Sequence, residues 1–148
     1  MSEITIRSGT IDDIPTVHQL VRELAIYENA EHEFVATLED YQQDFTDGVF
    51  STIVAEDDGQ VVGMCLYYLS YSTWKGRMLY LDDFVVKESK RGQGIGQLLY
   101  NELLVRAKAW KCRLVKWQVL DWNTPAINFY RQNQAIIENN WLNCKVFT

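Results

Sequence analysis

Hydrophobic and polar positions recur with two different periods along the chain, and together they predict a mixed fold of helices and strands. Residues 3–7 alternate, which predicts a first strand. Apolar positions from Ile14 to Leu24 then fall on one helical face, after a capping pattern formed by Thr10 and Asp13. The same capping spacing at Thr37 and Asp40 predicts a second, short helix that ends near residue 45.

The middle of the chain has three strand patterns rich in aromatic and β-branched residues. They cover residues 50–56, 61–70 and 78–86. An Asp-Gly turn joins the first two, and a short loop with Tyr71 and Trp74 precedes the third. We therefore expect an antiparallel meander, with a bulge near Gly63.

The last third predicts a helix up to about Lys111, a strand at residues 114–119 and a helix up to about Asn133. Since one helix separates residues 78–86 from residues 114–119, these two strands should be parallel neighbours. Pro125 fits the first position of the last helix if Thr124 is its cap. Two short strands are expected within residues 135–147. The fold class is thus α/β (α+β), with a mixed sheet of about seven strands and about four helices.

Length and composition favour one domain over residues 1–148. The net charge of -6 argues against a nucleic-acid partner and is compatible with a cationic substrate, or serves solubility alone. No apolar run reaches membrane-spanning length, and the N-terminus lacks a signal-peptide core. The three cysteines have no metal-site spacing, so we expect reduced thiols in a cytoplasmic protein without a metal.

The glycine-rich stretch at residues 90–96 is the main candidate for chemistry. It lies between a predicted strand and a predicted helix, where free backbone N–H groups and a positive helix end would face a phosphate. A Walker loop would need Lys-Ser or Lys-Thr after Gly96, and a dinucleotide fingerprint would need glycine at Gln97. The pattern Arg91-x-x-Gly94-x-Gly96 remains, either as another phosphate site or as a turn without a ligand.

Three separated motifs, at residues 80–84, 91–96 and 122–130, together with the order of elements, resemble the GNAT superfamily of N-acetyltransferases. Within it the chain is most similar to the diamine (spermidine/spermine) and thialysine N-acetyltransferase group. That group usually has Glu where Asp82 stands and glycine where Gln134 stands. The resemblance implies a GNAT fold, acetyl-CoA as co-substrate and a homodimer.

The resemblance also implies which residues hold acetyl-CoA. Backbone N–H groups of residues 93–96 would face the pyrophosphate, and the backbone of Val85 and Val86 would pair with the pantetheine arm like an added strand. Core packing is the alternative role for those valines, and capping is the alternative for Asn123. The complete set is Phe84, Val85, Val86, Arg91, Gly92, Gln93, Gly94, Ile95, Gly96, Asn123, Ala126, Asn128 and Tyr130.

By the same resemblance, Asp82 accepts a proton from the amine through a water, and Tyr130 protonates the leaving thiolate. An alkyl ammonium has a pKa of about 10.4, so a proton acceptor is needed at neutral pH. Asp82 and Asp83 should point to opposite faces of their strand unless a bulge intervenes. The alternatives are strand-end carboxylates satisfied locally and a tyrosine that closes a helix onto the sheet.

The acceptor is expected to be a small cationic amine, either a polyamine or a lysine-like amino acid such as thialysine. Its candidate binding residues are Tyr27, Glu28, Trp74, Asp82 and Asp83, because carboxylates pair with ammonium groups and aromatic rings hold them by cation–π contact. A protein or peptide lysine acetyltransferase and a catalytically silent acetyl-CoA-binding module are the alternative functions.

Overall fold

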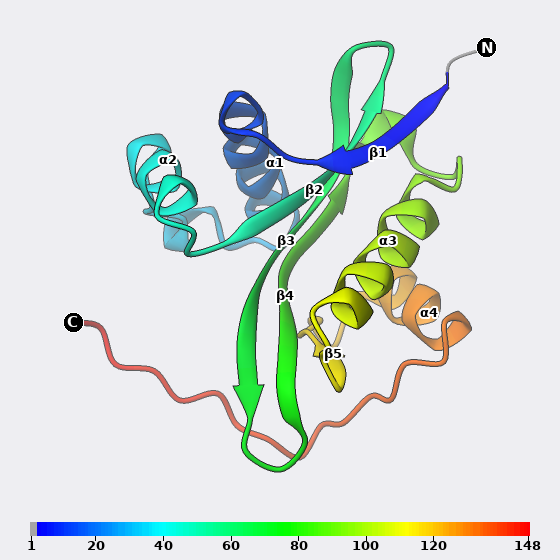
Figure 1. The fold of residues 1–148 in the computed structure, drawn as a ribbon. Coiled ribbons are helices and arrows are strands. Elements are labelled where there is room, and N and C mark those ends of the chain that lie inside the picture. Colours follow the sequence, from blue (N-terminus) through cyan, green and yellow to red (C-terminus); the bar gives the residue numbers. More distant parts are fainter. Residues whose placement is uncertain (1–2) are drawn as a thin grey trace. The chain divides into compact units, whose positions relative to one another are not determined.

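The structure is a computed structural model that describes residues 3–148. It contains two compact units, one ending at Gln118 and one spanning Val119–Thr148. The first unit has this order: β1 (Ile4–Ser8), α1 (Ile14–Tyr27), α2 (Leu38–Thr46), β2 (Ser51–Asp57), β3 (Gln60–Ser72), β4 (Gly76–Val86), α3 (Ile95–Ala109) and β5 (Leu114–Lys116), with short 3₁₀ turns at Ile11–Asp13, Glu31–Glu33 and Glu88–Lys90 (Figure 1). The second unit contains α4 (Thr124–Gln132).

The strands of the first unit form one mixed sheet in the order β1-β2-β3-β4-β5. Neighbours are antiparallel except β4 and β5, which are parallel, so the predicted meander and the predicted parallel pair are both confirmed. The bulge expected near Gly63 lies beside it, because Ala55 pairs with Gly63 whereas Glu56 pairs with Val61.

The prediction of about seven strands is wrong by two. The described residues form five strands, and residues 135–147 form neither helix nor strand. The apolar side chains of this segment are largely in solvent; Leu142, for example, is 90 % exposed. A two-stranded hairpin is marginal in water unless one face is covered, so the strand-like composition of this segment does not produce strands.

The helix starts follow the local capping chemistry. At α2, the Thr37 side chain accepts from the Asp40 N–H at 3.1 Å, and the Asp40 carboxylate accepts from the Thr37 N–H at 2.9 Å. At α4 the cap is Asn123, not Thr124, and its side chain accepts from the Ala126 N–H at 3.4 Å. Pro125 therefore occupies the second helical position, where its missing N–H still costs no intrahelical bond.

The sheet buries a different apolar cluster on each face. The cluster beneath α3 includes Ile53, Cys65, Leu79, Leu81, Leu99 and Leu103. The cluster beneath α1 and α2 includes Val17, Leu20, Val54, Met64, Leu66 and Val85. Figure 1 shows α1 and α2 on one side of the strands and α3 on the other. Residues 3–148 contain no helix long and apolar enough to cross a bilayer.

Candidate active site

A bulge in β4 decides where the two adjacent carboxylates point. Leu66 pairs with Asp83, but Tyr67 pairs with Leu81, so Asp82 is an extra residue without a partner position on β3. Before the bulge, Leu79 and Leu81 pack in the α3-side cluster; after it, Phe84 and Val86 pack there and Val85 packs on the opposite side. The alternation is thus reversed at Asp82, as a one-residue insertion requires.

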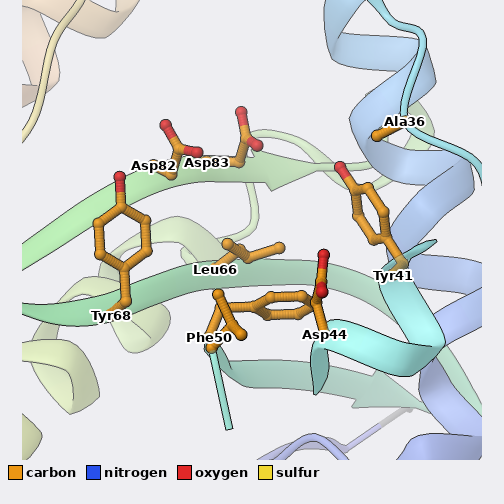
Figure 2. Close-up of a pocket in the computed structure, with 9 residues that line it drawn as sticks. Ala36, Tyr41, Asp44, Phe50, Leu66, Tyr68, Asp82 and Asp83 are labelled. Atoms are coloured by element: carbon orange, nitrogen blue, oxygen red, sulfur yellow. The ribbon is translucent and has the colours of Figure 1, made fainter. Parts of the chain in front are cut away.

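This reversal turns Asp82 and Asp83 toward the same face of the sheet, the face covered by α1 and α2. The prediction that they point to opposite faces holds only for a regular strand, and the bulge is the exception that this prediction allowed for. Both carboxylates line one cavity of about 220 Å³, together with Tyr41 and Tyr68. In Figure 2 the side chains of Asp82, Asp83 and Tyr68 extend in the same direction from neighbouring strands. The complete lining is Ala36, Tyr41, Asp44, Val49, Phe50, Leu66, Tyr68, Asp82 and Asp83.

The surroundings of Asp82 and Asp83 disfavour the negatively charged form of both carboxyls. Burial, together with the negative charges of Asp82 and Glu28, raises the pKa of Asp83 to about 7. Burial also raises the pKa values of Asp82 and Glu28. A bound cation would relieve this cost of charging the carboxyls.

Two phenols border the carboxylates and stay protonated at neutral pH. Burial and the charge of Asp82 raise the pKa of Tyr68 to about 12. Burial, with the charges of Asp83 and Asp82, holds the pKa of Tyr41 above its usual range. Both hydroxyls can therefore act as hydrogen-bond donors to a ligand or a water in the cavity.

The glycine loop has the backbone that an approaching anion needs. Gly92 and Gly94 have φ values of 78° and 82°, which are left-handed conformations that favour glycine. A Cβ atom at either position would meet nothing within 4 Å, so the space over the loop is open. Gly94 is the N-cap of α3 and has no side chain to cover the first-turn N–H groups. The loop therefore fits a pyrophosphate such as the one in coenzyme A.

The basic residues before the glycines have distinct positions. The Arg91 guanidinium donates from Nε to the Val86 carbonyl at 3.1 Å and lies 5.8 Å from the centre of the Tyr27 ring. Lys90 Nζ is 2.9 Å from Oδ2 of Asp57, a carboxylate that is 2 % exposed. The lysine thus fastens the loop to the β2–β3 hairpin, and the arginine joins it to the end of α1.

One edge of β4 opens next to the bulge. Pairing with β5 is confined to Met78, Leu79 and Tyr80, whereas β4 continues to Val86. Within residues 3–148, the stretch from Leu81 to Val86 pairs with β3 alone. Its second edge can accept an extended ligand as an added strand, and the buried Val85 side chain is compatible with that role because pairing uses only the backbone.

The second unit contains the remaining predicted residues. Asn123 and Tyr130 lie seven positions apart, two turns along α4, so they share a helical face. Tyr130 is 8 % exposed and its ring meets Phe129 edge-on at 5.8 Å, whereas Asn128 is exposed. Ala126 donates its N–H to the Asn123 cap.

The predicted acceptor residues separate into two groups. Glu28 is close enough to raise the pKa of Asp83, and Tyr27 contacts Arg91 of the glycine loop. Trp74 is 83 % exposed in the β3–β4 turn and does not line the cavity. Trp74 is therefore far from the carboxylates, because the part of β4 from Gly76 to Asp82 alone spans about 20 Å at about 3.3 Å per residue.

Several cavity residues were not identified from the sequence. Leu66 and Tyr68 could have been found, because the turn after β3 pairs it antiparallel with β4 and places Leu66 opposite Asp83. Tyr41, Asp44 and Phe50 have no such signal, since α2 and the start of β2 reach the cavity through tertiary packing. The described residues contain no group of three or more His, Cys, Asp or Glu placed to hold a metal ion.

Comparisons with known proteins agree with this geometry. The model of the acetyltransferase (GNAT) family matches residues 15–134. The thialysine N-epsilon-acetyltransferase of Bos taurus is 36 % identical over 141 residues, covering 88 % of this chain and 83 % of that protein. The spermidine/spermine N(1)-acetyltransferase-like protein 1 of Homo sapiens is 32 % identical over 145 residues, covering 92 % of this chain but 21 % of that protein. A structure of an aminoglycoside N-acetyltransferase in complex with CoA has a TM-score of 0.81 at 14 % identity, covering 99 % of this chain and 96 % of the other.

The chain therefore belongs to the acetyltransferase (GNAT) family, and its fold is the GNAT fold. It is an N-acetyltransferase, as its relatives are named, and members of this family use acetyl-CoA.

Proposed function

We propose that this chain moves the acetyl group of acetyl-CoA directly to a primary amine of a small cationic substrate, a polyamine or a lysine-like amino acid such as thialysine. The observation that carries this proposal is the cavity in which Asp82 and Asp83 lie side by side on one face of the sheet. The names of the bovine and human relatives support the same acceptors. Direct transfer is favoured because the described residues lining the cavity include no cysteine or serine that could carry the acetyl group.

In this proposal the glycine loop holds the donor. The N–H groups of residues 93–96 bind the pyrophosphate, Arg91 adds positive charge, and the edge of β4 that faces away from β3 at Val85 and Val86 pairs with the pantetheine arm. Phe84, Asn123, Ala126 and Asn128 complete the contact set. When bound, acetyl-CoA supplies the acetyl group as a reactive thioester. The family model spans residues 15–134, so the proposal treats residues 1–148 as one acetyltransferase domain.

Asp82 accepts the proton that the ammonium must lose, acting through a water, and Asp83 pairs with the cationic substrate. Asp82 is the more exposed of the two and has the freer access to water. Burial and the negative charge of Asp82 both raise the pKa of Asp83, so a cationic substrate would relieve the cost of charging it. Tyr130 donates the proton to the thiolate that leaves, since a phenol with a pKa of about 10 can protonate a thiolate with a pKa of about 8.5.

We also propose a cytoplasmic homodimer. The three cysteines are free, which suits a reducing compartment. Trp141, Leu142, Val146 and Phe147 are all more than two-thirds exposed, and such apolar side chains are suited to contact with a second copy. Sedimentation of the purified protein at several concentrations tests this, because a monomer at every concentration contradicts it.

Release of free thiol from acetyl-CoA, measured with a panel of amines, tests the enzyme proposal. We expect turnover with polyamines, thialysine or lysine, and much less with a lysine-containing peptide. Turnover on the peptide alone would favour a protein lysine acetyltransferase. Tight binding of acetyl-CoA without turnover on any amine would mean a silent binding module.

A further inference from the structure

The cavity contains a third carboxylate that the sequence did not point to. Asp44 reaches the lining from α2, whereas Asp82 and Asp83 reach it from β4 (Figure 2). Among the described residues that line this cavity there are three carboxylates and two phenols, and no lysine, arginine or histidine. The walls between the polar groups are apolar, formed mainly by Phe50 and Leu66.

Backbone and ring contacts hold the wall that carries Asp44 in place. The Asp44 carbonyl accepts from the Val49 N–H at 2.9 Å, which fixes the end of α2 against the start of β2. The Tyr41 ring meets the Phe50 ring at 5.8 Å and the His18 ring at 4.8 Å. His18 also contacts the Ala36 carbonyl at 3.0 Å through Nε2. A pocket fixed in this way loses little conformational entropy when it binds a ligand.

We propose that Asp44 is a specificity residue that binds a second ammonium group of the acceptor, so that the site selects diamines over amino acids with the same amine. This inference rests on the proposed function. The reacting amine lies at Asp82 and Asp83, and the methylene chain lies along Leu66 and Phe50. The remote ammonium lies at Asp44, next to the aromatic rings of the cavity wall.

The argument against amino acids is electrostatic. A substrate carboxylate would enter a cavity with three carboxylates and no described basic residue to pair with it. Desolvating that charge without a partner is unfavourable, and repulsion from the existing charges adds to the cost. A second ammonium instead meets an anion, although the exposed position of Asp44 limits the gain to a few-fold.

Three acceptors that differ in one group test the proposal: 1,5-diaminopentane, lysine, which adds only the carboxylate, and 1-aminopentane, which lacks the second amine. With the full-length protein and saturating acetyl-CoA, we expect kcat/KM for the diamine to exceed that for lysine by about tenfold or more. The preference for the diamine over the monoamine should decrease at high salt, because an exposed ion pair is screened.

Asp44→Asn should lower the ratio of diamine to monoamine kcat/KM by about threefold to fivefold, mainly through KM. Asp47→Asn removes the same charge from the end of the same helix but outside the cavity, and it should leave that ratio unchanged. A merely structural effect of Asp44→Asn would lower both rates equally and would overturn the assignment.

The outcomes separate this inference from the proposed function. If lysine is acetylated as well as or better than 1,5-diaminopentane, the diamine selectivity is wrong while the acetyltransferase assignment stands. If the ratio of diamine to monoamine kcat/KM is the same in Asp44→Asn as in the original protein, Asp44 is not the specificity residue. If no amine in the larger panel is acetylated, the proposed function itself fails.

Discussion

Replacing Asp83 by asparagine should make the protein more stable at neutral and alkaline pH. Asp83 is half-buried in the cavity, beside Asp82 and close enough to Glu28 for the two charges to repel. An asparagine of nearly the same shape removes the negative charge and keeps the side-chain volume nearly unchanged. The substitution therefore measures the electrostatic cost of keeping this carboxylate in the active site.

The size of the effect follows from the pKa of Asp83, which is about 7 in the folded protein against a usual value of 3.8. Between these values the folded protein keeps a proton that the unfolded chain has lost. The favourable contribution of Asp83 is therefore complete below about pH 4 and is lost as the pH rises through 7. Each pKa unit corresponds to about 1.4 kcal/mol, so the full loss is about 4 kcal/mol.

Urea unfolding of both proteins across a range of pH values checks this magnitude. The gain in the free energy of unfolding caused by Asp83→Asn should be about 1 kcal/mol at pH 4.5 and about 4 kcal/mol at pH 8. Asp58→Asn, in the exposed β2–β3 turn, is the matched control and should show no comparable trend with pH. A gain that is the same at every pH, or a loss of stability at pH 8, would refute the reasoning.

Three further predictions concern catalysis and donor binding. Asp82→Asn should lower kcat by about 100-fold. Because the substitution removes a like charge beside Asp83, it should also move the rise of kcat/KM with pH below about pH 7. Profiles of rate against pH check both effects, and an unchanged kcat would show that Asp82 is not the proton acceptor. Tyr130→Phe should lower turnover by about 100-fold with nearly the same affinity for acetyl-CoA in calorimetry, and an unaffected rate would exclude Tyr130 as the acid. Gly94→Ala and Gly48→Ala introduce similar strain, since both glycines have positive φ and open space around them, so each should lose about 1 kcal/mol of stability in urea unfolding. Only Gly94→Ala should weaken coenzyme A binding, by about threefold or more, and equal effects of the two variants on binding would mean that the loop does not hold the donor.

The sequence by itself determined the features that depend on neighbours along the chain. Periodicity and capping located the helices, and the Asp-Gly turn predicted the β2–β3 hairpin. The strand, glycine turn and helix around Gly94 predicted a candidate phosphate-binding loop, and in the structure the loop has left-handed glycines and a helix start without a side-chain cap. Such features are readable from sequence because a cap, a turn or an amphipathic face is formed by residues within a few positions of one another.

Tertiary structure decided what the candidate site became. The bulge at Asp82 exists only relative to the pairing partner on β3, and it alone turns Asp82 and Asp83 toward one cavity. Asp44 enters that cavity because α2 packs over the sheet, a contact between distant parts of the chain that no local pattern encodes. Residues 135–147 show the converse, since a strand-like composition forms no strand without a partner edge. Side-chain identity is local, but the face to which a side chain points depends on the register of the sheet, which is set by the whole fold.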